Sequence, residues 1–136
     1  MSDGTALSGN RATCLFIVLF AAAGSAGAQS ILQFDRWMQR IERRSQSVQR
    51  HLTAKDTQSA VTDAQEIGEL YKLMEGYFAQ RGNASDAVQI SRDGEVLAES
   101  IVRSAQAADF DTALRSAISI ARACRDCHFE FKPLDP

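Results

Sequence analysis

Apolar side chains recur every three or four positions along most of the chain from residue 31 onward, which is the spacing of helices that bury one face. Similar stretches follow one another at 31–52, 57–80, 85–105 and 110–131. The alternation with period two that marks a strand is scarce. In the first stretch the repeating apolar positions are Ile31, Phe34, Met38, Ile41, Val48 and Leu52. The pattern predicts an all-α chain of four helices, each of roughly 20 residues.

Polar residues and glycines mark the expected helix ends. Asp56 or Thr57 is expected to cap the second helix, because side chains of these types accept hydrogen bonds from the first amides of a helix. Asp109 or Asp111 is expected to do the same for the fourth helix. The dipeptide at 82–83, glycine then asparagine, predicts a left-handed cap after the second helix. The Asp-Gly pair at 93–94 resembles a turn, but the apolar periodicity continues through it, so we predict one helix there.

Short links between these helices predict an up-down-up-down antiparallel four-helix bundle. In that topology the start of the first helix, the end of the second, the start of the third and the end of the fourth share one end of the bundle. Met38, Met74 and His128 are therefore expected at the same level. The face of the fourth helix that we expect to point inward carries Phe110, Leu114, Ala117, Ala121, Cys124, His128 and Phe131.

The last predicted helix carries the sequence Cys-Arg-Asp-Cys-His at 124–128. This is the attachment pattern of a c-type haem. The thiols of Cys124 and Cys127 would add to the two vinyl groups of one haem, and the imidazole of His128 would bind the iron as proximal ligand. On a helix the three residues fall on one face, at spacings of three and four, so one ring can reach all of them.

Other interpretations of two cysteines at this spacing are weaker. A structural zinc site needs four ligands, and the further candidates are only His51 and Cys14. A thioredoxin-like redox pair, and with it a thiol-disulfide enzyme, belongs near a βαβ pattern, which this sequence lacks. An ordinary disulfide between Cys124 and Cys127 is the main remaining alternative.

The N-terminal segment has the organisation of a secretory signal peptide. Arg11 precedes a short apolar run from 14 to 23, and small residues then lead to an A-x-A cleavage site ending at Ala28. The run is well short of the roughly 20 residues of a membrane span. We therefore expect residues 1–28 to be removed, with Cys14, and a cytochrome domain of residues 29–136 to be exported to the periplasm without a membrane span.

Length and charge add limits to this interpretation. A chain of 136 residues is expected to form one domain, and a net charge of −2 gives no case for binding nucleic acid. The first helix has a strongly basic face, which could be solvated, pair with haem propionates, or pair with the acidic helix that follows. Its arginines are Arg36, Arg40, Arg43, Arg44 and Arg50.

The residue on the other side of the iron decides the chemistry of such a haem. A methionine sulfur there makes a low-spin electron carrier, whereas an apolar residue leaves an open site for a gas. Met38 lies on a helix adjacent to the motif helix and is the expected sixth ligand. Met74, on the diagonal helix, is a second candidate, and an apolar cap such as Phe34 or Tyr71 is a third possibility. His51 lies at the far end of its helix and is discounted.

At this point the chain resembles the cytochrome c′ family, the class II c-type cytochromes that include the c-556 type. The resemblance covers the order of leader, four helices and C-terminal haem motif, and is most specific over 121–132, ARACRDCHFEFK. Arg125 matches a basic residue that typically follows the first cysteine, and Phe131 with Lys132 matches an aromatic-basic pair. By this resemblance Cys124 and Cys127 hold the haem and His128 ligates it.

The resemblance also implies that the first helix supplies the distal residue, a role that Met38 matches. Arg36 and Arg40 are the nearest bases for the propionates, and Arg125 is a candidate for contact with the haem edge. Family members often dimerise through their first two helices, so a homodimer is also implied.

These observations together predict a periplasmic protein with one covalent haem c, which carries one electron at a time and is not an enzyme. Its expected partners are periplasmic redox proteins that it meets transiently. The alternative is a five-coordinate protein of the c′ type, with an open iron that binds the small gases NO or CO.

Overall fold

The computed structural model describes residues 31–131, and the side chains of residues 31–129 within that range. Four α-helices follow one another: α1 (Ile31–Thr53), α2 (Thr57–Ala79), α3 (Ser85–Gln106) and α4 (Phe110–Phe131). The four helices and their boundaries agree with the predicted stretches to within a few residues. The predicted signal peptide and its cleavage site lie outside the described residues.

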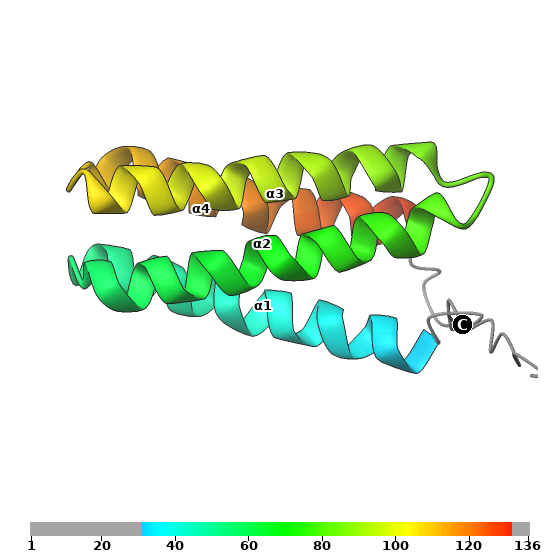
Figure 1. Cartoon of the computed structure of the whole chain (residues 1–136), viewed down its shortest axis with the longest axis horizontal. Helices are drawn as coiled ribbons and strands as arrows, with labels where there is room; N and C mark the ends of the chain where they lie inside the picture. The colour runs from blue at the N-terminus through cyan, green and yellow to red at the C-terminus, as the bar shows by residue number, and fades with distance from the viewer. Residues whose placement is uncertain (1–30, 132–136) are drawn as a thin grey trace, which may run out of the picture.

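The helices pack side by side, and each runs antiparallel to the next, as Figure 1 shows. α2 and α3 make the most extensive contact, whereas α4 and α1 close the ring of helices with the least extensive one. The start of α1 and the end of α4 lie at the same end of the bundle (Figure 1). We call this end of the bundle the motif end. The opposite end, which contains the α1–α2 and α3–α4 links, is called the loop end. The predicted all-α four-helix bundle is confirmed, and no described helix is long and apolar enough to cross a bilayer.

Two of the helix starts have the side-chain caps that the sequence predicts. The carboxylate of Asp56 accepts a hydrogen bond from the amide of Ser59, and that of Asp109 accepts one from the amide of Thr112, each at 3.1 Å. These hydrogen bonds hold the pKa of both carboxyls below the ordinary value. α3 also starts where predicted, but Ala84 offers no side-chain cap there.

The predicted left-handed cap at Gly82 is wrong. The described glycines all have negative φ, and α2 ends with an ordinary turn in which the amide of Arg81 bonds to the carbonyl of Phe78 at 2.9 Å. Positive φ occurs instead at Lys55 and Ala108, in the two short links at the loop end. The helix across the Asp-Gly pair at 93–94 is continuous, as predicted.

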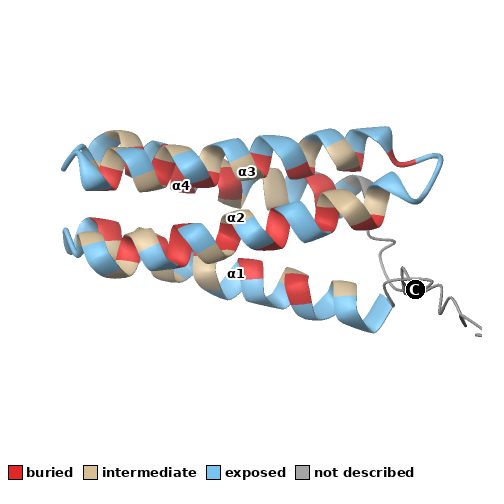
Figure 2. Cartoon of the chain, viewed as in Figure 1, coloured by how far each residue is buried: buried red, intermediate tan, exposed pale blue. Residues whose placement is uncertain are grey.

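The core runs the length of the bundle, and buried positions face the neighbouring helices in Figure 2. On α1 the predicted stripe is confirmed at Ile41, Val48 and Leu52, which are buried. Ile31 is also predicted to be buried but is 67% exposed, whereas Trp37, which is not part of the stripe, is buried. On α4 the predicted inward face is confirmed at Ala117, and Phe110, Leu114 and Cys124 pack against the core, but His128 is exposed. The buried face also includes Ala113, Ile120 and Cys127, which the pattern does not single out. The prediction that His128 points inward is therefore wrong, and the side chain of Phe131 lies outside the described ones.

Candidate functional site

A small internal cavity lies at the motif end, where side chains from all four helices meet. Its volume, counted as space for the centre of a water molecule, is about 10 Å³. The lining residues are Met38, Ile41, Tyr71, Met74, Ile90, Ala123, Cys124 and Cys127. Both motif cysteines and both methionines singled out from the sequence thus share one apolar cavity. This agrees with the prediction, made from the antiparallel order of the helices, that Met38 and Met74 lie at the same height along the bundle as the motif.

The two cysteines present their thiols differently. Cys127 is buried, at 6% exposed, whereas Cys124 is half-buried and packs against the core cluster. The two side chains are not joined in a disulfide. Burial raises the pKa of the Cys124 thiol, and a hydrogen bond from Tyr71 offsets part of that rise. A raised thiol pKa is the opposite of what a thiol-disulfide exchange enzyme uses.

Tyr71 brings a polar atom close to the first cysteine of the motif. Its hydroxyl oxygen lies 3.7 Å from the sulfur of Cys124, and its side chain is otherwise buried. Burial, and then the proximity of Cys124, raises the pKa of the phenol far above its ordinary value. The ring lies against Gly94 of α3, where a Cβ, if the residue had one, would come within 2.5 Å of the ring carbons. Sequence patterns place Tyr71 on an apolar face, but they do not reveal this contact between helices.

His128 stands outside this cavity. It follows the buried Cys127 directly, but its own side chain is exposed on the flank of α4 and does not line the cavity. Arg125, on the same helix, is also exposed. The described geometry therefore brings together the cysteines and the methionines, but not the predicted proximal ligand.

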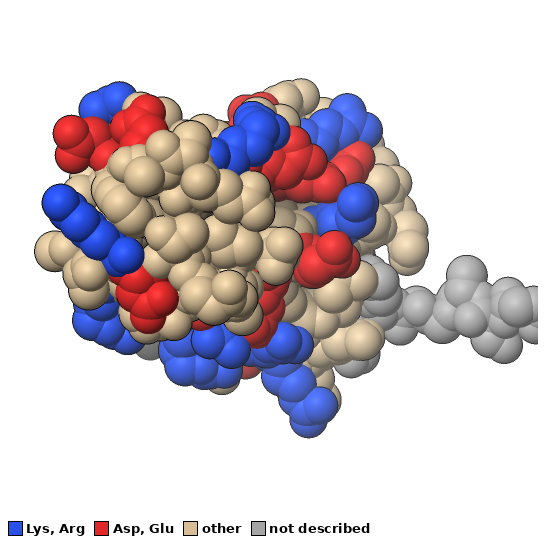
Figure 3. Space-filling view, turned by 60° about the vertical axis from the view of Figure 1, so that its left-hand side comes forward, with Lys and Arg blue, Asp and Glu red and all other residues tan. Residues whose placement is uncertain are grey.

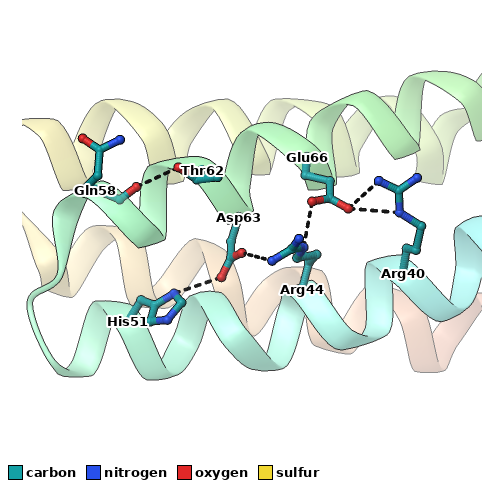
Figure 4. Close-up of polar contacts among 7 residues, drawn as sticks. All are labelled: Arg40, Arg44, His51, Gln58, Thr62, Asp63 and Glu66. Atoms are coloured by element: carbon teal, nitrogen blue, oxygen red, sulfur yellow. Dashed lines mark hydrogen bonds and ion pairs between the residues drawn. The ribbon is translucent and has the colours of Figure 1, made fainter.

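Two of the five arginines on the basic face of α1 pair with acidic residues of α2. Arg40 donates to Glu66 at 2.7 Å, and Arg44 bridges Glu66 at 2.7 Å and Asp63 at 2.8 Å (Figure 4). His51 lies 3.0 Å from the second carboxylate oxygen of Asp63. Pairing with the acidic helix is therefore confirmed for Arg40 and Arg44, whereas the other three arginines of this face are exposed. Asp63 itself is 2% exposed, and the apolar periodicity gave no sign of it.

The remaining arginines of α1 lie at the surface. Figure 3 shows lysine and arginine side chains along the lower edge of the molecule, the side on which α1 lies in Figure 1. Arg36, proposed from the sequence for a propionate, is exposed there. A shallow hollow of about 460 Å³ on this side is lined by Arg40, Arg43, Arg44, Gln46, Ser47, Arg50 and Glu66. It contains neither cysteine of the motif.

The chemistry of the side chains that line the motif-end cavity fits a covalently bound haem. Two thiols one turn apart, two thioethers and an apolar lining are the groups that such a ring uses. Sites for ligands of this size occupy several hundred Å³, so the cavity would have to widen for a haem to bind here. The contact between α1 and α4, which we call the α1–α4 seam, is the least extensive one between adjacent helices. It borders the cavity, with Met38 and Ile41 on the α1 side and both cysteines on the α4 side. Opening this seam would provide the space.

A structural zinc site finds no support in this part of the chain. Across residues 31–131 no group of three His, Cys, Asp and Glu side chains gathers to hold a metal ion. His51, the candidate for a further ligand, is paired with Asp63.

Comparison with protein-family models, with curated proteins and with solved structures found no match to this chain.

Proposed function

We propose that this chain is a mono-haem c-type cytochrome of the periplasm that acts as a soluble one-electron carrier. The observation that supports the proposal most strongly is the shared cavity: both cysteines of the haem motif line it together with Met38 and Met74. A disulfide or a packed core would not require two thioethers beside the motif, whereas an electron-carrying haem uses one as its sixth ligand. The haem would supply reversible one-electron chemistry at its iron.

In this proposal the residues of α4 hold the cofactor. Cys124 and Cys127 carry the two thioether links, and His128, on the next position of the same helix, is the proximal ligand. Because His128 is exposed, its imidazole is accessible at the surface of α4. Arg125 is also exposed near the motif and would meet the edge of the ring.

Met38 is the proposed sixth ligand. It lies on α1, which is adjacent to α4, and it is only partly buried, so its sulfur can turn without unpacking the core. Met74 is 2% exposed on α2, within the centre of the core, and is the second candidate. Arg40 is bonded to Glu66, so its proposed contact with a propionate requires that ion pair to rearrange. Arg36 is exposed.

The second candidate function is the binding of NO or CO at a five-coordinate iron. One feature of the cavity favours it: the hydroxyl of Tyr71, which can donate a hydrogen bond to a small bound ligand. In this case Met38 and Met74 would serve only as packing residues.

Absorption spectra separate the two functions. The secreted protein is purified in its oxidised, reduced and CO-treated forms, beside Met38→Ala and the matched variant Met74→Ala. The electron-carrier proposal predicts a low-spin wild type that resists CO, and a Met38→Ala variant that becomes high-spin and binds CO. A wild type that is already high-spin and binds CO freely would refute it in favour of the gas-binding function. If Met74→Ala alone has the effect, the ligand assignment changes to Met74.

A further inference from the structure

Among the side chains that line the motif-end cavity, the phenol of Tyr71 carries the single oxygen atom; the others are apolar or carry sulfur. Its hydroxyl lies within hydrogen-bonding distance of Cys124, at 3.7 Å from the sulfur. A buried hydroxyl without a partner is costly, so this contact is favoured in a cavity that offers few acceptors. It joins the middle of α2 to the first cysteine of the motif.

The position of the phenol is set by its surroundings. On α3, the absence of a side chain at Gly94 leaves the space that the ring occupies, because a Cβ there would lie 2.5 Å from the nearest ring carbons. Tyr71 is 2% exposed, and it belongs to the core cluster that also holds Ile67, Leu70 and Met74. A buried, close-packed ring has little rotational freedom. The hydroxyl is therefore a fixed point toward which a more mobile neighbour can be oriented.

Cys124 is such a neighbour. It is half-buried, whereas Cys127 is 6% exposed and packed among core residues. A side chain at the edge of a core can reach several staggered χ1 positions, and only some of these direct its sulfur into the cavity. Packing alone therefore restricts the direction of the Cys127 sulfur more than that of the Cys124 sulfur.

We propose that Tyr71 is a positioning residue for Cys124, directing its sulfur into the cavity for attachment of the porphyrin. The inference rests on the proposed haem function. In the attachment step the Cys124 sulfur bonds to one vinyl carbon, and its hydrogen passes to the other vinyl carbon as the double bond becomes single. No oxidant or reductant is consumed. The thioether sulfur then has no hydrogen, so the Tyr71 hydroxyl becomes the donor in the contact that persists.

The contact can be tested first in the full-length chain produced without haem. The chain has 2 tyrosines, Tyr71 and Tyr77, so labelling the ring carbon that bears the hydroxyl with ¹³C gives two signals in an NMR spectrum. Tyr71→Phe identifies the signal of Tyr71. The proposal predicts that Cys124→Ala shifts this signal more than Cys127→Ala does, and that it leaves the Tyr77 signal in place. An unmoved Tyr71 signal, or equal shifts in both variants, would overturn it.

The second test measures attachment in the secreted protein made with haem-attachment machinery. Peptide mass analysis gives the fraction of haem-bearing chains in which Cys124 is still a thiol while Cys127 carries the haem. Tyr71→Phe should raise this fraction roughly two- to tenfold, the factor that corresponds to losing one hydrogen bond. The matched control is Tyr77→Phe, because Tyr77 is also buried on α2 but contacts Phe34 and Arg81 rather than a cysteine.

The outcomes of this second test separate the two proposals. An increase in Tyr71→Phe but not in Tyr77→Phe supports the positioning role. No increase, or an equal increase in both variants, overturns it while the haem function stands. A wild type without covalent haem overturns the haem function, and the attachment role of Tyr71 with it; the NMR test then decides only whether the tyrosine-cysteine contact exists.

Discussion

The two ends of the bundle are built differently, although the same four helices form both. At the loop end, Asp56 and Asp109 cap their helices, and Asp63 joins Arg44 and His51. At the motif end α3 starts without a side-chain cap, Ile31 is exposed, and the packing leaves a small cavity beside the cysteines. The loop end therefore combines side-chain caps with a buried ion-pair cluster, whereas the packing at the motif end is less complete beside the cysteines.

α1 shows the same contrast within one helix. Its flank toward α2 is fastened by ion pairs of Arg40 and Arg44 with Glu66. Its contact with α4 is the least extensive contact between any two adjacent helices of the bundle. Phe34 near its start stacks on Tyr77 of α2, with ring centroids 4.3 Å apart. α1 is therefore attached more firmly to α2 than to α4.

Truncating one apolar side chain at each end should give the largest effect and tests the comparison directly. Leu52→Ala at the loop end removes a side chain that is 2% exposed and should lower the free energy of unfolding by about 3 kcal/mol. Met38→Ala at the motif end removes a partly buried side chain beside an existing cavity and should cost about 1 kcal/mol in the haem-free chain. Urea unfolding measures both. Equal costs would mean that the ends do not differ in packing.

Removing the carboxylate of Asp63 should cost about 2 kcal/mol, because Asp63 is buried and bonds to both Arg44 and His51. The control is Glu99→Ala, which breaks an ion pair with Arg103 in which both side chains are exposed and should change stability by less than about 0.5 kcal/mol. Thermal unfolding of Asp63→Ala and Glu99→Ala provides the comparison. If Asp63→Ala is as harmless as Glu99→Ala, the ion pairs at the loop end do not fasten α1 to α2.

Two glycines should respond in opposite directions to the same substitution. Gly94→Ala places a methyl group 2.5 Å from the Tyr71 ring, and the resulting displacement should outweigh the gain in helix propensity, for a net loss of about 1 kcal/mol. Gly76→Ala meets no atom within 4 Å and should stabilise the chain by about 0.5–1 kcal/mol. Denaturant titration shows the signs. A stabilising Gly94→Ala would refute the proposed role of Gly94 in seating Tyr71.

The smallest effect concerns pH at the loop end. The Asp56 pKa is lowered in the folded state by its hydrogen bond to Ser59, so the cap stabilises the fold above the carboxyl's unfolded pKa, near 4. That stabilisation is lost as pH falls through the lower folded pKa. The difference in melting temperature between wild type and Asp56→Ala should therefore shrink as pH falls below about 4. A difference in melting temperature that is independent of pH would show that the charge of Asp56 does not contribute to the stability of the fold.

The sequence pattern predicts the elements and their order well, because the apolar repeats are long and Asp56 and Asp109 are strong capping residues. It also predicts that Met38 and Met74 lie near the cysteines, which follows from antiparallel order alone. On α4 the predicted inward face is confirmed at Ala117 but is wrong at His128, since alanines occur on several faces of this helix and apolar periodicity then does not locate the edge of the inward one. The seating of Tyr71 against Gly94 depends on contacts between α2 and α3, which a linear pattern does not contain.

The most direct test of the central claim is the intact mass of the secreted chain, produced with c-type haem-attachment machinery and extracted with acidified acetone. The account predicts the mass of the processed chain plus one haem, with the added mass on the peptide that contains Cys124 and Cys127. A chain that carries no haem mass after this treatment, with its two cysteines as thiols or as a disulfide, would contradict it.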